Sequence, residues 1–303
     1  MNGRWWLLAS LLALASATLH AQREDQCNPL SRLQHEPGSK SDAGDLSPIL
    51  APAKPFQLTE TDYLAHGRAA LESPTAILLP VKSRRVNLDL DDVRVVGVLA
   101  GPQATTPTAA VLIIPGLTGL SKDVSRHAEV FAQHGGLALS VDLFGGRQPA
   151  NRREAIDLVR QLNRSQTLAM LRAASQWLAE QSGHGKLNMG VAGYGLGAEW
   201  ALAMAGQSPA PRGVALFAGG VTEDPQILAG IHCPLIGFFA RQDGYLTPDR
   251  VKTFENALNK AGVKNQFFLY ETAPGFAIQP KDVVAKRYAE TAVERTLDFI
   301  RRQ

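Results

Sequence analysis

The pattern of apolar and polar positions changes near residue 81. Residues 28–60 are rich in Ser, Pro, Asp and Lys and have no sustained apolar period, which is typical of a loosely ordered segment. Residues 85–90 (RVNLDL) then alternate between apolar and polar, and residues 93–99 (VRVVGVL) end at a Gly-Pro pair. The two runs predict an antiparallel hairpin.

Buried strands and amphipathic helices alternate after this hairpin. The runs predict strands at 110–115, 137–142, 187–192, 213–217, 234–240 and 266–270. Helical spacing is found up to about 133, over 153–181 with a break near Arg164, and over 198–206, 248–261 and 281–302. This alternation predicts a mostly parallel sheet covered by helices on both faces. Ligands bind at the carboxyl ends of such strands, so the turns that follow strands are the candidate sites.

The first 21 residues predict a secretory signal peptide. Arg4 provides the positive start, residues 5–19 form a short apolar run, and Ala15-Ser16-Ala17 and Leu19-His20-Ala21 offer cleavage sites. No later segment has the length and hydropathy of a membrane anchor. We therefore expect an exported protein, periplasmic or secreted, with a signal peptide at 1–21, a poorly ordered lead-in at 22–80 and one domain at 81–303.

Composition excludes several classes of protein. With 303 residues, 45% hydrophobic and 19% charged, the chain is neither disordered nor fibrous. A net charge of +3, from 31 Lys and Arg against 28 Asp and Glu, is too small to predict a nucleic-acid surface. Two cysteines cannot form a four-ligand zinc site. Cys27 and Cys233 either form one disulfide in an oxidising compartment or stay as two thiols.

One turn between a strand and a helix carries a recognisable glycine pattern. Residues 191–198 read VAGYGLGA, which fits the nucleophile elbow Gly-x-Nuc-x-Gly with Gly195 at the nucleophile position. Gly195 has no nucleophilic side chain. The same string fits Gly-x-Gly-x-x-Ala, but a dinucleotide site needs this pattern in the first strand–helix unit. Several strands precede it here, so we expect no cofactor; Gly195 could also merely relax a strained turn.

Several separate segments resemble one enzyme family. They are VDLFGGRQP at 141–149, VAGYGLGA at 191–198, FARQDGYLTP at 239–248, LYETAPGFA at 269–277 and ERTLDFI at 294–300. In this order they resemble the dienelactone hydrolases of the α/β-hydrolase superfamily, from about Ala110 to the C-terminus. The resemblance implies an α/β-hydrolase fold for residues 81–303.

The family's catalytic residues are only partly present. Its members use a Cys or Ser nucleophile, an Asp and a His, in that chain order. By resemblance, Asp243 holds the acid position, Gly195 the nucleophile position, and Gly275, or a one-residue deletion, the His position. The family's glutamate after the early strand is missing, because 115–119 (PGLTG) stands there.

The parts of the site that need only backbone could persist. By resemblance, the N–H groups of Leu117 and Leu196 are the oxyanion donors, and Leu196 also lies at a helix N-terminus. Tyr194 adjoins the elbow. Arg147 lies near the family's substrate-carboxylate arginine, and an exposed loop arginine is an equal alternative. These four residues are the candidate ligand-binding set, and nothing resembles a metal site.

No histidine is placed to replace the missing base. None of the seven histidines follows the last predicted strand. His127 is the one that its helix could bring near the elbow, and we expect a surface or partly buried residue there rather than a base.

Loss of a nucleophile and its base removes several orders of magnitude in rate. The sequence therefore predicts a protein with a degenerate triad that binds a small carboxylate- or ester-like ligand, or a protein partner, instead of hydrolysing it. The alternative is a carboxylic ester hydrolase with a rewired site, in which Asp243, Glu199 or Tyr245 activates water. A structural or interaction protein is the third class.

Overall fold

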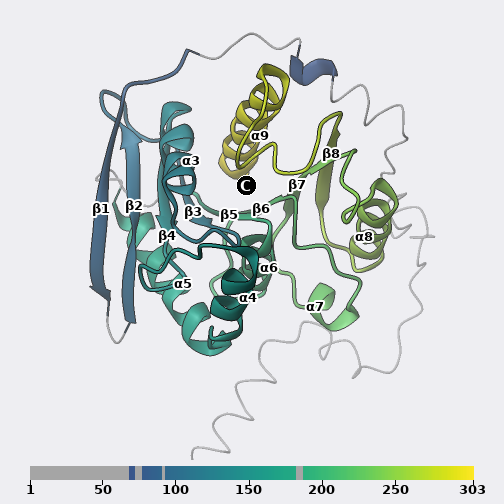
Figure 1. Cartoon of the computed structure of the whole chain (residues 1–303), viewed down its shortest axis with the longest axis horizontal. Helices are drawn as coiled ribbons and strands as arrows, with labels where there is room; N and C mark the ends of the chain where they lie inside the picture. Colours follow the sequence, from purple (N-terminus) through teal and green to yellow (C-terminus); the bar gives the residue numbers. More distant parts are fainter. Residues whose placement is uncertain (1–67, 72–76, 91–92, 182–186) are drawn as a thin grey trace, which may run out of the picture. The chain divides into compact units, whose positions relative to one another are not determined.

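The computed structural model describes residues 68–71, 77–90, 93–181 and 187–303. Within these ranges the chain forms one eight-stranded sheet in the order β1-β2-β4-β3-β5-β6-β7-β8 (Figure 1). The strands are β1 (Val81–Leu90), β2 (Val93–Pro102), β3 (Ala109–Ile114), β4 (Gly136–Val141), β5 (Met189–Tyr194), β6 (Gly213–Phe217), β7 (Leu235–Ala240) and β8 (Asn265–Tyr270).

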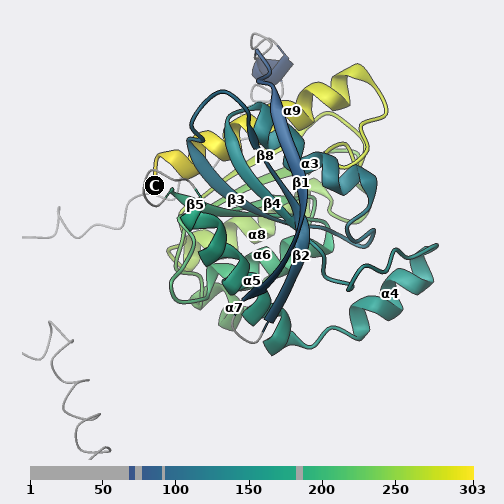
Figure 2. The same cartoon turned by 90° about the vertical axis from the view of Figure 1, so that its left-hand side faces the viewer.

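The sheet is antiparallel at one edge and parallel elsewhere. β1 pairs antiparallel with β2, with Val81 opposite Pro102, and β2 pairs antiparallel with β4. All other neighbouring pairs are parallel. Figure 2 shows the β1–β2 hairpin at the near edge of the sheet. The predicted hairpin and the mostly parallel sheet are both confirmed.

Helices cover both faces of the sheet. They are α3 (Lys122–Gln133), α4 (Arg152–Arg160), α5 (Arg164–Glu180), α6 (Leu196–Ala205), α7 (Pro225–Ala229), α8 (Pro248–Lys260) and α9 (Val283–Arg301). α3 and α9 lie on one face, and α5, α6 and α8 on the other (Figure 1). The sheet therefore separates two apolar layers.

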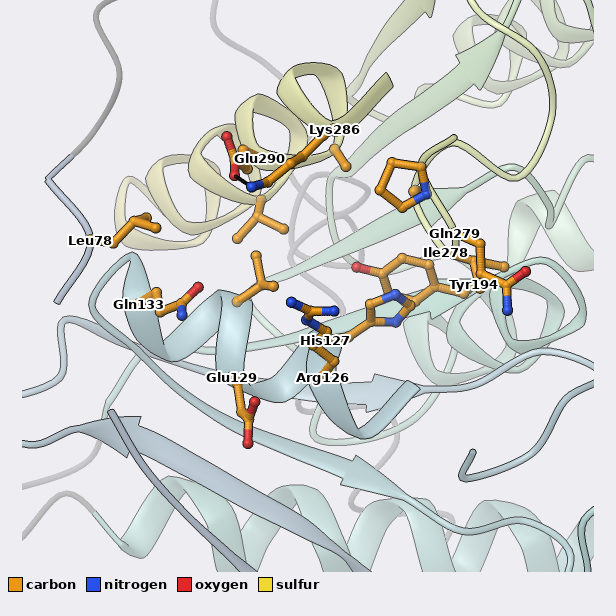
Figure 3. Close-up of a pocket in the computed structure, with 15 residues that line it drawn as sticks. Leu78, Arg126, His127, Glu129, Gln133, Tyr194, Ile278, Gln279, Lys286 and Glu290 are labelled. Atoms are coloured by element: carbon orange, nitrogen blue, oxygen red, sulfur yellow. Dashed lines mark ion pairs between the residues drawn. The ribbon is translucent and has the colours of Figure 1, made fainter. Parts of the chain in front are cut away.

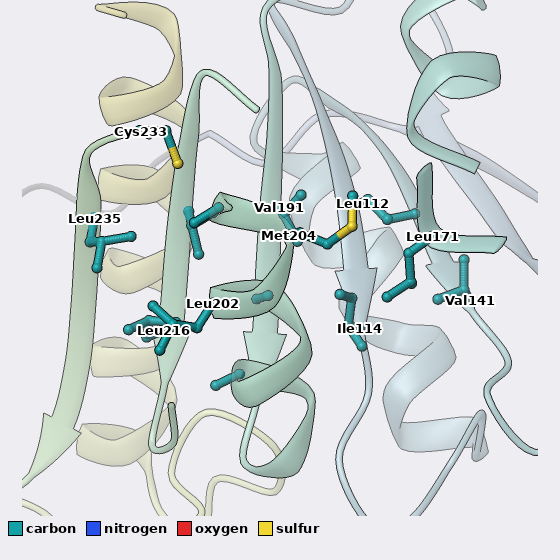
Figure 4. Close-up of a cluster of buried hydrophobic side chains, with 14 of the residues drawn as sticks. Leu112, Ile114, Val141, Leu171, Val191, Leu202, Met204, Leu216, Cys233 and Leu235 are labelled. Carbon is teal, nitrogen blue, oxygen red and sulfur yellow. The ribbon is translucent and has the colours of Figure 1, made fainter. Parts of the chain in front are cut away.

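Side-chain alternation along the strands assigns residues to the two layers. In β3, Leu112 and Ile114 join the layer under α5 and α6, whereas Val111 and Ile113 join the layer under α3 and α9. All six residues of β3 are buried, as expected for a strand covered on both faces. Figure 4 shows the first layer around Leu112, Val191 and Leu216.

Local capping explains where several helices begin. The predicted break near Arg164 is confirmed: α4 ends at Arg160, and Asn163 begins α5 by accepting a hydrogen bond from Gln166 N. The sequence analysis missed α7, which is five residues long and begins at the N-cap Asp224. A helix of five residues is too short to show the 3.6-residue spacing of apolar positions by which longer helices are predicted.

The proposed signal peptide at 1–21, and most of the lead-in at 22–80, lie outside the described residues. The described residues 68–71 of the lead-in are helical. Ala70 is buried there, and its carbonyl accepts a hydrogen bond from Thr291 Oγ1 of α9. None of the helices in the described ranges combines the length and hydropathy needed to cross a bilayer.

Candidate functional site

The turn between β5 and α6 has an unusual backbone conformation. Gly195 adopts φ 54° and ψ −117°, a region that L-residues enter only under strain. A strained strand-to-helix turn is the geometry that exposes the nucleophile of an α/β-hydrolase. A Cβ built on Gly195 would meet no atom within 4 Å. The turn therefore has the backbone shape and the space for a side chain, but carries none.

The glycines that flank Gly195 are required by close backbone contacts. A Cβ on Gly193 would lie 2.3 Å from the carbonyl oxygen of Gly197, and one on Gly197 would lie 2.1 Å from the carbonyl oxygen of Ile114. Both distances are far below van der Waals contact. The two flanking glycines thus reflect the tight packing of α6 against β5 and β3.

The turn after β3 packs against the same place. A Cβ on Gly116 would lie 2.8 Å from the carbonyl oxygen of Tyr194 and 3.8 Å from the amide nitrogen of Leu196. Gly116 directly precedes Leu117, and Leu196 is the first residue of α6. The structure thus brings together the two turns that carry the expected oxyanion donors. Backbone N–H groups at a helix N-terminus favour a negative charge.

The loops after β7 and β8 are tied to each other at the same end of the sheet. Arg241 N donates to Tyr270 O at 2.9 Å, and Gln242 N donates to Thr272 O at 3.2 Å. Asp243 Oδ1 accepts hydrogen bonds from Tyr245 N at 2.8 Å and Leu246 N at 2.9 Å. Asp243 therefore caps its own turn, and no histidine of the described residues bonds to it.

Gly275 follows in the loop after β8. It has φ 82°, and a Cβ built there would meet nothing within 4 Å. Like Gly195, this position has open space for a side chain. That Gly275 stands at the family's His position stays a prediction.

Arg147 is engaged by its own loop. Its Nε donates to Phe144 O at 3.2 Å, and its Nη1 donates to Gln161 Oε1 at 3.1 Å. The side chain is exposed, and the small cavity that it borders shares no lining residue with the elbow. These contacts are those of a loop arginine, and a role in binding a carboxylate stays a prediction.

Tyr194 connects the elbow to the α3–α9 face. As the last residue of β5, it lies in the layer under α3 and α9, and only 1% of it is exposed. Its ring stacks on His127 at 4.4 Å on one side and on Phe217 at 4.3 Å on the other. Burial raises the pKa of the Tyr194 hydroxyl well above its usual range, so the phenol stays protonated.

His127 is more buried than the sequence analysis expected. Only 7% of it is exposed, because α3 turns it inward onto the ring of Tyr194. A spacing of four residues places His127 and the fully buried Phe131 on one face of α3, which is the signal that could have indicated its burial.

A cavity of about 600 Å³ adjoins Tyr194 and His127 (Figure 3). It lies between α3 and α9 and is closed at one end by residues 277–280. This cavity was not foreseen, because its existence depends on the separation of two helices far apart in the sequence.

Other candidate groups lie elsewhere. On α6, partial burial raises the pKa of the Glu199 carboxyl. Cys233 forms no disulfide within the described residues, and burial raises its pKa to about 12. Cys27 lies outside them, so the disulfide stays a prediction. The described part of the chain contains no group of three or more His, Cys, Asp or Glu residues arranged to hold a metal ion.

Comparisons with known proteins identify the fold and the family of the chain. One similar solved structure is a dienelactone hydrolase from Anabaena variabilis, with 22% sequence identity and a TM-score of 0.54; the match covers 71% of this chain and 96% of that one. Another is a protein described as a putative dienelactone hydrolase from Klebsiella pneumoniae, with 18% identity and a TM-score of 0.64; the match covers 73% of this chain and 98% of that one. A fungal esterase from Rhizomucor miehei is also similar, with 15% identity and a TM-score of 0.57; the match covers 88% of this chain and 93% of that one. These likenesses show the α/β-hydrolase fold.

No curated protein matches the chain. The model of the dienelactone hydrolase family, in contrast, matches residues 95–303, which is more than half of the chain. The chain therefore belongs to the dienelactone hydrolase family.

Proposed function

We propose that this protein binds a small carboxylate- or ester-like ligand at the elbow and does not hydrolyse it. The observation that carries the proposal is Gly195, which keeps the strained elbow conformation with open space above it but has no side chain to attack a carbonyl. Gly275, at the family's His position by resemblance, likewise offers no base.

The chemistry that remains is the binding of negative charge. Acyl transfer through a covalent intermediate needs a nucleophile and a base to activate it. The turn of Leu117 and the start of α6 at Leu196 need only their backbone N–H groups to hold an oxyanion or a carboxylate oxygen. A carboxylate- or ester-like molecule is the ligand class that such donors suit.

Export forms part of the proposal. The Arg4-led apolar run of residues 1–21 supports secretion to the periplasm or the medium, where the protein would meet its ligand. An N-terminal sequence of the protein recovered from the periplasm or culture medium tests this point: a start at Gln22 supports cleavage, and an intact Met1 contradicts it.

Restoring the missing side chains tests the proposal most directly. The purified protein should not hydrolyse 4-nitrophenyl acetate above the rate of a no-protein control. The double variant Gly195→Ser/Gly275→His should gain a rate at least ~10-fold above that of the parent, because a nucleophile–base pair contributes orders of magnitude. Gly195→Ala/Gly275→His is the matched control, since it introduces the same backbone strain, about 1–3 kcal/mol at each position, without a nucleophile.

The rewired hydrolase is the outcome that would overturn this proposal. It predicts that the parent turns over the ester and that Asp243→Ala, Glu199→Gln or Tyr245→Phe abolishes the activity. Circular dichroism of each variant confirms that a loss of rate is not a loss of fold.

A further inference from the structure

The cavity between α3 and α9 has the properties of a second binding site. Its volume of about 600 Å³ lies within the range of small-molecule pockets. It lies between α3 and α9 (Figure 3), whereas the expected elbow donors lie in the turns that follow β3 and β5. None of Leu117, Gly195 and Leu196 lines it. A ligand there would not contact the expected oxyanion donors of the elbow.

The floor of the cavity holds a tyrosine hydroxyl without a hydrogen-bond partner among the described residues. Tyr194 is 99% buried, and both faces of its ring are covered by His127 and Phe217. Its hydroxyl points into the cavity (Figure 3). Within the described ranges no residue forms a hydrogen bond with Tyr194 Oη. A buried tyrosine hydroxyl normally has a partner, so a ligand acceptor would satisfy it.

The charged side chains around the cavity differ in whether another described residue pairs with them. Glu129 accepts a hydrogen bond from Ser83 Oγ at 2.7 Å, and Glu290 pairs with Lys286 at 3.8 Å. Arg126 also lines the cavity, and it has no ion pair or hydrogen bond among the residues that the structure describes. Its guanidinium suits a carboxylate, which can accept two parallel N–H bonds.

Part of the remaining wall is apolar. Val130 comes from α3, Ala289 and Val293 from α9, and Ile278 from the loop after β8. These side chains favour a hydrocarbon body beside the polar groups.

We propose that the α3–α9 cavity binds a monocarboxylate with an apolar body, whose carboxylate accepts hydrogen bonds from Arg126 and from the Tyr194 hydroxyl. The body of the ligand lies against Val130, Ile278 and Val293. The proposal does not rest on the function proposed for the elbow.

Octanoate is a suitable probe, with octanamide as its neutral counterpart. Isothermal titration of the full chain should show that octanoate binds and that octanamide binds at least ~10-fold more weakly. Arg126→Gln should weaken octanoate binding by about 10-fold and leave octanamide unchanged, because only the anion uses the guanidinium. Tyr194→Phe should weaken it by about 3- to 10-fold and keep the stacked ring.

Two further variants locate the site. Ala289→Trp fills the cavity and should abolish the part of octanoate binding that Arg126→Gln weakens, because any octanoate held at the elbow is independent of Arg126. Arg126 has an exposed side chain, so Arg126→Gln remains decisive if the tryptophan variant unfolds. Arg84→Gln, an exposed arginine of β1 outside the cavity, should bind octanoate as the parent does.

Each contrary result overturns the proposal. Octanoate that fails to bind at millimolar concentration, or that binds equally to the parent and to Arg126→Gln, contradicts it. Gly195→Ser/Gly275→His should keep the parent's affinity for octanoate whether or not it gains esterase activity, which separates this test from that of the elbow.

Discussion

The two faces of the sheet are filled in different ways. Under α5, α6 and α8 the layer is a continuous apolar core that reaches from Val141 to Phe254 and Leu269. Under α3 and α9 the layer is equally apolar in the strands, but it ends in a cavity with a tyrosine hydroxyl and an imidazole at its floor. One face therefore stabilises the fold, whereas the other also offers the Tyr194 hydroxyl, to which no described residue forms a hydrogen bond.

The difference indicates where binding can arise away from the elbow. Buried polar groups without partners cost stability, so a chain that keeps them gains something else from them. The strand alternation of β5 places Tyr194 on the α3–α9 face, directly before Gly195. A ligand in the cavity would thus contact the residue next to the elbow without using the elbow itself.

The largest effect should come from a cavity made in the filled face. Phe254 of α8 is fully buried and stacks on Phe267 at 5.4 Å. We expect Phe254→Ala to lower the free energy of unfolding by about 3–5 kcal/mol, since the neighbours cannot close the space. Urea denaturation measures this. A loss below about 1 kcal/mol would mean that this face is as loosely filled as the other.

Removing the hydroxyl from two buried tyrosines of the α3–α9 layer, Tyr270 and Tyr194, should have smaller and unequal effects on the free energy of unfolding. Tyr270 Oη accepts a hydrogen bond from Arg295 Nη1 at 3.2 Å, whereas no described residue bonds to Tyr194 Oη. Tyr270→Phe should lower the free energy of unfolding by about 1 kcal/mol, because the guanidinium loses its acceptor. Tyr194→Phe should leave it within about 0.5 kcal/mol of the parent or raise it, since no bond is lost.

Urea denaturation of the two variants side by side gives the comparison. Both substitutions remove one oxygen from a ring that stays stacked on its neighbours, so they are matched in volume. Equal losses in the two variants would show that Tyr194 has a partner in the folded protein, and would remove the main support for the cavity as a binding site.

The sequence predicted the strands better than it predicted the cavity. Buried strands are short continuous apolar runs, so the strand expected at 213–217 is observed at Gly213–Phe217, and that expected at 110–115 at Ala109–Ile114. The elbow was found because close backbone contacts require glycine at fixed spacing. Contacts between side chains far apart in the chain leave no such local pattern.

His127 and Tyr194 illustrate that limit. Their rings stack across 67 positions of sequence, and the contact depends on the angle at which α3 crosses β5. The width of the cavity depends in the same way on how far α9 lies from α3. Packing distances of this kind follow from the whole fold, so they could not be read from the residues of either helix.

The smallest effect should be a pH dependence that belongs to the α3–α9 face. His134, which follows α3, has its side chain almost fully buried and its Nδ1 lies 3.4 Å from Glu294 Oε1 of α9. Burial lowers the pKa of His134; the nearby Glu290 opposes this shift and Arg287 adds to it. Burial also raises the pKa of Glu294.

The two shifts act on stability in opposite directions. Because the pKa of His134 is lower in the folded chain, the unfolded chain binds more protons below about pH 6.5, and stability falls as the pH drops. Protonation of Glu294 instead favours the folded chain as the pH falls. We therefore compare the parent with His134→Gln, which removes only the histidine titration and keeps the glutamate.

As the pH falls from 7.5 to 5.5, the free energy of unfolding of the parent should decrease relative to that of His134→Gln. The expected decrease is up to about 1 kcal/mol, because a shift of one pKa unit corresponds to about 1.4 kcal/mol. Thermal unfolding at intervals of half a pH unit measures the difference between the two curves. If the curve of His134→Gln runs parallel to that of the parent, His134 titrates alike in the folded and unfolded chains, and the polar groups of this face do not make its stability depend on pH.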